Sequence, residues 1–168
     1  MVSFATLVEE LDASDMLGHL RNFPLDLARA WKAAEGWDFS AIENQQYSGV
    51  ICLGMGGSAS GGDFLSCLSD ADGCLPFVSH RGYDLPTWAS EKWLVLSTSY
   101  SGNTEETIDA TEAAIGLGCT VIGMSSGGKM KTLLEDSNQT WIELTGGQPP
   151  RSAFGHIFGA QVAISWKL

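Results

Sequence analysis

Side chains able to bind an anion gather in the stretch SYSGNTEET, residues 99–107, which directly follows the apolar run WLVLST. Ser99, Ser101 and Thr104 bring three hydroxyls within six residues, and Gly102 lets the backbone turn closely. If a helix begins here, these hydroxyls surround its positive end, where the first N–H groups have no partner within the helix. Hydroxyls and such N–H groups can bind a phosphate without any lysine or arginine. The stretch therefore predicts a phosphate-binding turn.

Helix capping is the alternative explanation for these polar residues. Asn103 and Glu106 have the spacing of a capping box, so we expect a helix whose first residue is Thr104. Serine and threonine most often serve as caps and turn residues. One cap needs only one hydroxyl, however, so three of them within six residues favour anion binding.

A second glycine-rich turn, GMGGSAS at 54–60, also stands between an apolar run and a helical segment. It matches the dinucleotide pattern G-x-G-x-x-A, which leaves a nucleotide cofactor as an alternative. The acidic residue that binds the ribose in such sites is missing, since His80 and Arg81 stand there instead. Arg81 would suit a 2′-phosphate. A single phosphosugar held by both turns nevertheless explains more of the sequence, because a nucleotide leaves SYSGNTEET without a role.

The loop GGQPPRSAFG, residues 146–155, combines two prolines with Arg151, which we expect to enter a helix at its N-terminal end. A cation at that end opposes the helix dipole, so helix stability does not explain it. A solvated surface arginine is the ordinary alternative. A functional Arg151 would stabilise an oxyanion or a developing enediolate. For His156, on the apolar helix that follows, we expect a core or interface position and not the role of a general base.

Five short apolar runs alternate with helical segments, which predicts an α/β fold with a parallel sheet covered by helices on both faces. Both polar turns then lie at the carboxyl edge of the sheet, where ligands bind in such folds. The predicted strands are GVICLG (49–54), LPFVS (75–79), WLVLST (93–98), TVIGM (120–124) and TWIEL (140–144). The predicted helices between them are SASGGDFLSCLSD (58–70), TEETIDATEAAIGLG (104–118) and KMKTLLEDS (129–137).

Helices are also expected at both ends of the chain. Residues 13–36 carry apolar residues at helical spacing on either side of Pro24, which predicts two separate helical pieces. The last segment, SAFGHIFGAQVAISWKL, is apolar around most of its circumference and needs partners on more than one side. We therefore expect a homodimer or a missing second half to cover it. The expected division is a helical lead-in at 1–40 and one binding domain at 41–168.

Composition narrows the function classes. With 168 residues, 44 % of them hydrophobic and 17 % charged, the chain has the make-up of one globular domain. A formal net charge of -11 disfavours nucleic acid and anionic membranes as partners. The cysteines and histidines lack metal-binding spacing, so we expect no metal and buried, reduced thiols. No signal peptide or membrane span is visible, which predicts a cytoplasmic protein.

Together these motifs resemble the sugar isomerase (SIS) domain, and most closely the N-terminal half of the bifunctional phosphoglucose/phosphomannose isomerases. The segments that carry the resemblance are, in order, GMGGS (54–58), YDLP (83–86), SYSGNTEET (99–107) and PPRSAFG (149–155). The resemblance implies a three-layer, flavodoxin-like parallel sheet that binds a hexose 6-phosphate. It further implies an aldose–ketose isomerisation through an enediolate, with neither a metal nor a redox cofactor.

The resemblance also implies roles for individual residues. Arg151 would stabilise the enediolate. No residue of this chain is assigned as the general base, because the family's catalytic glutamate and ring-opening histidine lie in a second SIS half. The residues that match the family's phosphate-binding positions are Gly57, Ser58, Ser99, Ser101 and Thr104.

Two other functions remain open on the sequence alone. A single SIS module would bind a phosphosugar as a sensor or regulatory domain without turning it over. A nucleotide-dependent oxidoreductase would instead use the glycine-rich turn at 54–60 to bind NAD(P).

Overall fold

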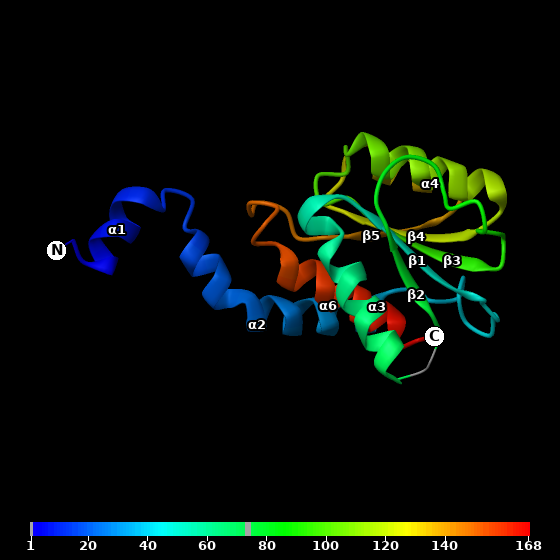
Figure 1. Cartoon of the computed structure of the whole chain (residues 1–168), viewed down its shortest axis with the longest axis horizontal. Helices are drawn as coiled ribbons and strands as arrows, with labels where there is room; N and C mark the ends of the chain where they lie inside the picture. The colour runs from blue at the N-terminus through cyan, green and yellow to red at the C-terminus, as the bar shows by residue number, and fades with distance from the viewer. Residues whose placement is uncertain (1, 73–74) are drawn as a thin grey trace.

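A five-stranded parallel sheet forms the centre of the protein, seen in a computed structural model that describes residues 2–72 and 75–168 (Figure 1). The strand order is β2-β1-β3-β4-β5, which is that of flavodoxin-like folds. Every apolar run predicted as a strand forms one, with ends that differ from expectation by at most two residues. The strands are β1 (Gly49–Gly54), β2 (Phe77–His80), β3 (Trp93–Thr98), β4 (Thr120–Ser125) and β5 (Thr140–Glu143).

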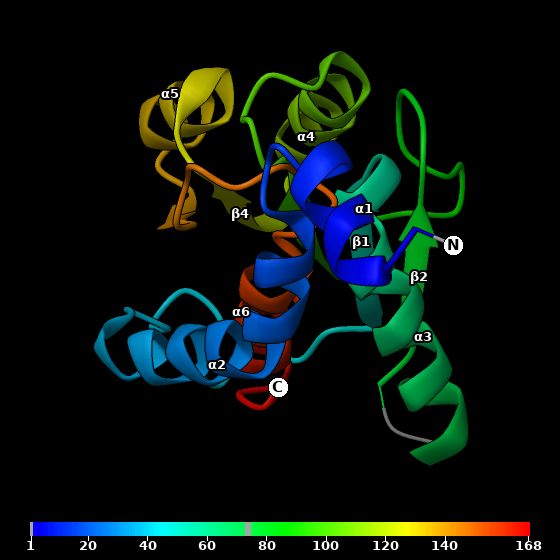
Figure 2. The same ribbon diagram turned by 90° about the vertical axis from the view of Figure 1, so that its left-hand side faces the viewer.

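Helices cover both faces of this sheet, which confirms the expected three-layer arrangement (Figure 2). One face packs against α4 (Glu105–Leu117) and α5 (Gly128–Asp136). The other packs against α3 (Ser60–Asp72) and α6 (Phe154–Ser165). The site-bearing turns at the carboxyl ends of the strands therefore stand on a sheet that is supported from both sides.

Each face of the sheet has its own hydrophobic core, and successive residues of a strand contribute to the two cores in turn. In β1, Val50 and Cys52 contact the α3 and α6 side, whereas Ile51 and Leu53 contact the α4 and α5 side. All four side chains are at most 2 % exposed. Strands buried on both faces must be apolar at consecutive positions, which is why they are visible as continuous apolar runs.

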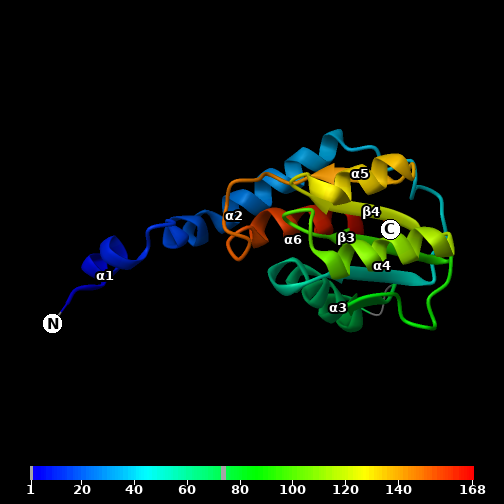
Figure 3. The same ribbon diagram turned by 90° about the horizontal axis from the view of Figure 1, so that it is seen from above.

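Two helices precede the sheet and extend away from it (Figure 3). The first, α1 (Phe4–Leu11), buries none of its residues. The second, α2 (Met16–Ala33), continues through Pro24 as one helix, so the prediction of two separate pieces is wrong. Proline removes one backbone hydrogen bond and crowds the carbonyl four residues earlier. Pro24 is exposed, however, so water can reach that carbonyl while the later turns of α2 pack on α6.

Short 3-10 helices complete the described part of the chain. They are η1 (Ala34–Gly36), which follows α2, and η2 (Gly56–Ser58), which follows β1. No helix among residues 2–72 and 75–168 has both the length and the apolar character of a membrane span.

The cysteines follow expectation only in part. Cys52 and Cys119 are buried free thiols, but Cys67 is an exposed free thiol, so the prediction of burial is wrong there. Cys74 lies outside the described residues. Burial raises the pKa of the Cys52 thiol to about 12, and the nearby charge of Asp63 adds to the rise. This thiol therefore stays protonated near neutral pH.

Helices α2 and α6 approach closely at two glycines of α6. A Cβ at Gly159 would lie 2.8 Å from the Leu27 carbonyl oxygen and 2.9 Å from Ala30 Cβ. A Cβ at Gly155 would lie 2.9 Å from the Phe23 carbonyl oxygen. These distances are shorter than ordinary van der Waals contacts, so the spacing of the two helices depends on glycine at both positions.

We expect Gly159→Ala to lower the free energy of unfolding by about 1–3 kcal/mol, because the added methyl group must push α2 away from α6. Urea denaturation of the chain measures this change. Gly116→Ala in α4 is the matched control, because a Cβ there would meet no atom within 4 Å. That variant should instead gain about 0.5–1 kcal/mol from helix propensity. Equal stabilisation by both substitutions would contradict the close approach of the two helices.

Candidate functional site

Tyr100, two residues after the end of β3, joins the turns that follow three other strands. Its N–H donates to Ser58 Oγ at 3.2 Å, in the turn after β1. Its carbonyl oxygen accepts from the N–H and Oγ of Ser126, at 2.9 and 2.8 Å, in the turn after β4. Its hydroxyl donates to the Thr145 carbonyl oxygen at 2.9 Å and accepts the N–H of Gln148 at 3.2 Å, in the loop after β5. One buried tyrosine thus holds the carboxyl edge of the sheet together.

The turn between β3 and α4 holds the three hydroxyls predicted to bind phosphate. Ser99 is fully buried, and its Oγ donates to Thr104 Oγ1 at 3.0 Å and accepts the Thr104 N–H at 3.3 Å. Ser101 is exposed, and its Oγ accepts the N–H of Asn103 at 3.3 Å. The Ser99 hydroxyl is therefore occupied within the turn and shielded from solvent, whereas Ser101 and Thr104 reach the surface. All three hydroxyls lie beside the N-terminus of α4.

The helix α4 begins one residue later than predicted. Thr104 is its N-cap and Glu105 its first residue, so the predicted capping box of Asn103 and Glu106 is wrong. Asn103 makes a tertiary contact instead, because its Oδ1 accepts the N–H of Lys129 at 3.1 Å. The side chain thereby ties this turn to the start of α5. A partner 26 residues away leaves no local pattern in the sequence.

The turns after β3 and β4 pack against each other at glycines. Gly102 has a φ of +71°, and a Cβ there would clash with the Gly127 carbonyl oxygen. A Cβ at Gly128 would lie 2.7 Å from the Ser101 carbonyl oxygen. Both positions therefore require glycine for their conformation and for the close approach. The SSGGK run, which begins at Ser125 and ends in α5, forms a wall beside the hydroxyl-rich turn.

The turn after β1 brings Gly57 and Ser58 to the same edge, because Ser58 accepts from the backbone of Tyr100. A Cβ at Gly57 would lie 3.3 Å from the Pro150 carbonyl oxygen and 3.8 Å from Arg151 Cα. The loop after β5 therefore runs directly beside the glycine turn. Three neighbouring segments, the turns after β1 and β3 and the loop after β5, thus carry all the residues expected at the site. These residues are Gly57, Ser58, Ser99, Ser101, Thr104 and Arg151.

Arg151 is not part of the helix that follows it. It is exposed and lies in a turn, and α6 begins only at Phe154. The expectation that Arg151 enters the helix is therefore wrong, because Ser152 closes a turn first by donating its N–H to the Pro149 carbonyl oxygen at 2.9 Å. An arginine held on a loop can face a ligand at the sheet edge without opposing the dipole within the first helical turn.

Arg81, which left a nucleotide site open, forms an ion pair with Asp63 of α3. The hydrogen bond from its guanidinium holds the pKa of the Asp63 carboxyl below its usual range. The Arg81 guanidinium also donates to Ser79 Oγ at 3.4 Å. An arginine paired in this way is a weaker partner for a 2′-phosphate, so the arrangement favours a phosphosugar over a dinucleotide.

Two residues that organise this edge, Tyr100 and Gln148, are not predicted from the sequence. Tyr100 stood within the hydroxyl-rich stretch, so its position was the available signal, but its three sets of partners are distant in sequence. For Gln148, the sequence offers no indication of a role except its position in the loop before Arg151. His156 is 6 % exposed, as expected for a core histidine, and it contacts Gln148.

Comparison with curated proteins finds relatives in one enzyme class. No known protein-family profile matches the chain. The chain is 33 % identical over 144 residues to the bifunctional phosphoglucose/phosphomannose isomerase of Caldicellulosiruptor bescii, covering 85 % of this chain and 42 % of that protein. It is 34 % identical over 116 residues to the D-glucosamine-6-phosphate 4-epimerase of Sulfolobus acidocaldarius, covering 68 % and 36 %. The chain therefore spans less than half the length of these relatives.

Solved structures show the same fold. The tagatose-6-phosphate ketose/aldose isomerase of Escherichia coli superposes with a TM-score of 0.70 at 18 % identity, covering 89 % of this chain and 46 % of that one. An Escherichia coli CFT073 protein in complex with A5P superposes with a TM-score of 0.61 at 16 % identity, covering 92 % and 91 %. At these identities the likeness shows the fold alone.

The sheet order, the two-sided helix layers and these neighbours define the class: the chain has the fold of phosphosugar isomerases of the sugar isomerase (SIS) type. Within this class its sequence is similar to the bifunctional phosphoglucose/phosphomannose isomerases, of which it matches about two fifths. The resemblance carried by the four sequence motifs is thereby confirmed.

Removing the Tyr100 hydroxyl should loosen the loop after β5. Tyr100→Phe leaves the N–H of Gln148 and the carbonyl of Thr145 without this partner, so the free energy of unfolding should fall by about 1–3 kcal/mol. Urea denaturation measures the change. Tyr47→Phe serves as control, because its hydroxyl makes only a 3.5 Å bond to the Ala41 carbonyl oxygen at the surface. Wild-type stability of Tyr100→Phe would show that the ring, not the hydroxyl, organises the edge.

Proposed function

We propose that this chain is the N-terminal, phosphosugar-binding SIS half of a phosphoglucose/phosphomannose isomerase, which interconverts glucose 6-phosphate or mannose 6-phosphate with fructose 6-phosphate. One observation carries the proposal above the others. The 3.2 Å contact between the Tyr100 N–H and Ser58 Oγ joins the two polar turns at one sheet edge, directly beside the loop of Arg151. Relatives that are named for this activity support it.

The proposed phosphate position lies between the turns after β1 and β3. A phosphate there would face the N-terminus of α4, whose dipole favours an anion. Neutral donors suffice for this, so the net charge of -11 does not oppose a local phosphate site. The residues proposed to hold the phosphate, through hydroxyls or backbone N–H groups, are Gly57, Ser58, Ser99, Ser101 and Thr104.

The proposed reaction moves a proton between C2 and C1 of the open-chain sugar. A base removes the C2 proton, and the electron pair forms the C1–C2 double bond as negative charge develops on O1. Arg151 would stabilise that charge. Return of that proton to C1 and transfer of the O2 proton to O1 then give the ketose. The resemblance places the base and a ring-opening histidine in a second SIS half, outside this chain.

The proposal therefore requires a second SIS half in the complete gene product, which acts either in the same molecule or on its partner in a homodimer. Helix α6 itself is covered within the chain by α2 and α3, so it does not need the neighbour that its apolar sequence led us to expect. The exposed apolar side chain that a neighbour could cover is Trp166, which follows α6 and is 77 % exposed. We also propose a cytoplasmic location. The three described cysteines are free thiols, as is usual in a reducing compartment.

Replacement of Arg151 should impair turnover. In the complete gene product, Arg151→Ala should lower kcat by about 10²–10³-fold, because the enediolate loses its cationic partner. A coupled assay of fructose 6-phosphate formation measures this. Arg21→Ala, at an exposed arginine of α2, is the matched control and should retain wild-type kcat. Wild-type kcat in Arg151→Ala would remove Arg151 from the mechanism.

Replacement of Ser101 should instead weaken binding. Ser101→Ala should raise the Kd for fructose 6-phosphate by about tenfold, since a hydrogen bond to a charged group is lost. Calorimetry on the 168-residue chain measures this directly. Binding by wild type without turnover by the complete gene product would favour a sensor module. Absence of any binding would reject both the isomerase and the sensor.

A further inference from the structure

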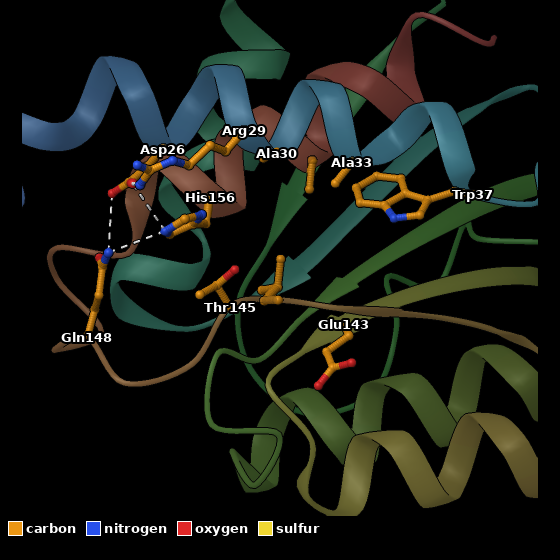
Figure 4. A pocket seen from close by; sticks show the side chains of 11 residues that line it. Asp26, Arg29, Ala30, Ala33, Trp37, Glu143, Thr145, Gln148 and His156 are labelled. Atoms are coloured by element: carbon orange, nitrogen blue, oxygen red, sulfur yellow. Dashed lines mark hydrogen bonds and ion pairs between the residues drawn. The ribbon is translucent and has the colours of Figure 1, made fainter.

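A buried polar cluster joins α2, α6 and the loop that carries Arg151 (Figure 4). Asp26 of α2 is 1 % exposed, and its Oδ2 accepts from Gln148 Nε2 at 3.2 Å. His156 Nε2 lies 3.5 Å from Asp26 Oδ1 and 3.2 Å from Gln148 Nε2. Arg29 Nη1 lies 3.3 Å from Asp26 Oδ1. Figure 4 shows these side chains converging from two helices and the loop.

A purely structural role for Asp26 would be to join α2 to α6. The close helix approach places it there, because a Cβ at Gly155 would lie 3.0 Å from Asp26 Cβ. Arg29 belongs to α2 itself, and the partner His156 belongs to α6, so the contact with His156 fits that role. Gln148 does not, because it lies in neither helix. Its contact extends the cluster from the helix pair to the loop at the sheet edge.

Gln148 is held at two points. Its N–H donates to the Tyr100 hydroxyl at 3.2 Å, and its side-chain nitrogen donates to Asp26. A carboxylate can only accept, so Asp26 determines which way the amide faces. The opposite amide atom, Oε1, is buried and has no hydrogen-bond partner in the described part of the chain. The side chain is therefore oriented by its donated hydrogen bonds.

The connection from Gln148 to Arg151 is short and stiff. Pro149 and Pro150 lie between them, and each ring restricts its own φ. Ser152 donates both its N–H and its Oγ to the Pro149 carbonyl oxygen, each at 2.9 Å. A displacement of Gln148 is therefore transmitted to Arg151 instead of being absorbed within the loop.

A cavity of about 210 Å³ borders the cluster, lined in part by Asp26, Gln148 and His156. Apolar side chains line much of it, but the polar groups of the cluster face it and it has room for several water molecules. Removal of the Gln148 amide would therefore let water reach Asp26, so the carboxylate stays solvated and the helices stay packed. The loop loses its attachment while the fold is kept.

We propose that Asp26, acting through Gln148, is a positioning residue for Arg151 during isomerisation. This inference rests on the proposed isomerase function. Neither Asp26 nor Gln148 belongs to the proposed phosphate-binding group, so their loss acts on the charge-stabilising step more than on phosphate binding. A misplacement of about 1 Å costs about 10²-fold in rate.

Kinetics of the complete gene product test the proposal with two variants of one residue. Gln148→Ala should lower kcat by about 10²-fold with little change in KM. Gln148→Glu keeps the size of the side chain but sets a carboxylate against Asp26, so it should be at least as slow. If Gln148 only filled space, Gln148→Glu would have a higher kcat than Gln148→Ala. Gln46→Ala, at an exposed glutamine outside the cluster, should match wild type.

A double-mutant cycle tests whether Asp26 acts through Gln148. Asp26→Asn should lower kcat, and Asp26→Asn combined with Gln148→Ala should be no slower than the slower single variant. Multiplicative losses would show that the two residues act independently and would overturn the proposal.

Hydrogen exchange provides a readout that does not depend on the reaction. Amides of residues 146–153 should exchange faster in Gln148→Ala and Asp26→Asn than in wild type, while those of β1 and β3 stay protected. An active wild type with unchanged exchange and unchanged kcat in Gln148→Ala would overturn the positioning role alone. A wild-type gene product without isomerase activity would overturn the proposed function and this role with it.

Discussion

The hydrogen bonds of Tyr100 are the constraint on which the rest of the site depends. Strands in a parallel sheet share a backbone ladder, but the turns that follow them do not. Tyr100 supplies the missing connections, because its N–H, carbonyl oxygen and hydroxyl bond to the turns after β1, β4 and β5. The residue lies between two of the hydroxyls proposed to bind phosphate. The proposed ligand groups and the loop of Arg151 are therefore arranged about one buried side chain.

Close approach at glycines is the second requirement. Gly57 lets the loop of Arg151 run beside the turn after β1, and Gly102 lets the turns after β3 and β4 meet. Gly155 and Gly159 set the spacing between α2 and α6, which in turn brings Asp26 to Gln148. An added methyl group would make a tight contact at Gly57, and at the other three glycines it would overlap a neighbouring backbone or side chain.

The roles proposed for this edge divide the charges of a phosphosugar between two sets of groups. Phosphate contact is proposed for neutral hydroxyls and N–H groups at the N-terminus of α4, while Arg151 is the proposed cation for charge that develops at the other end of the sugar. Two other arginines of the chain are used differently. Arg29 contacts buried Asp26, and Arg81 pairs with Asp63, so neither is free to replace Arg151.

Local sequence pattern is sufficient for the sheet and for the edge of the sheet at which the polar turns lie. Strands buried on both faces must be continuously apolar, so β1 and β3 are found at their predicted limits, and the polar turns between strand and helix lie at the predicted edge. The course of α2 through Pro24, the use of Asn103 by α5, and the contact of Asp26 with Gln148 were decided only by the tertiary structure. Each depends on a solvent-facing position or on a partner far along the chain, 122 residues away for Asp26. Periodicity reports burial and secondary structure, but it carries no information about which distant polar groups will meet.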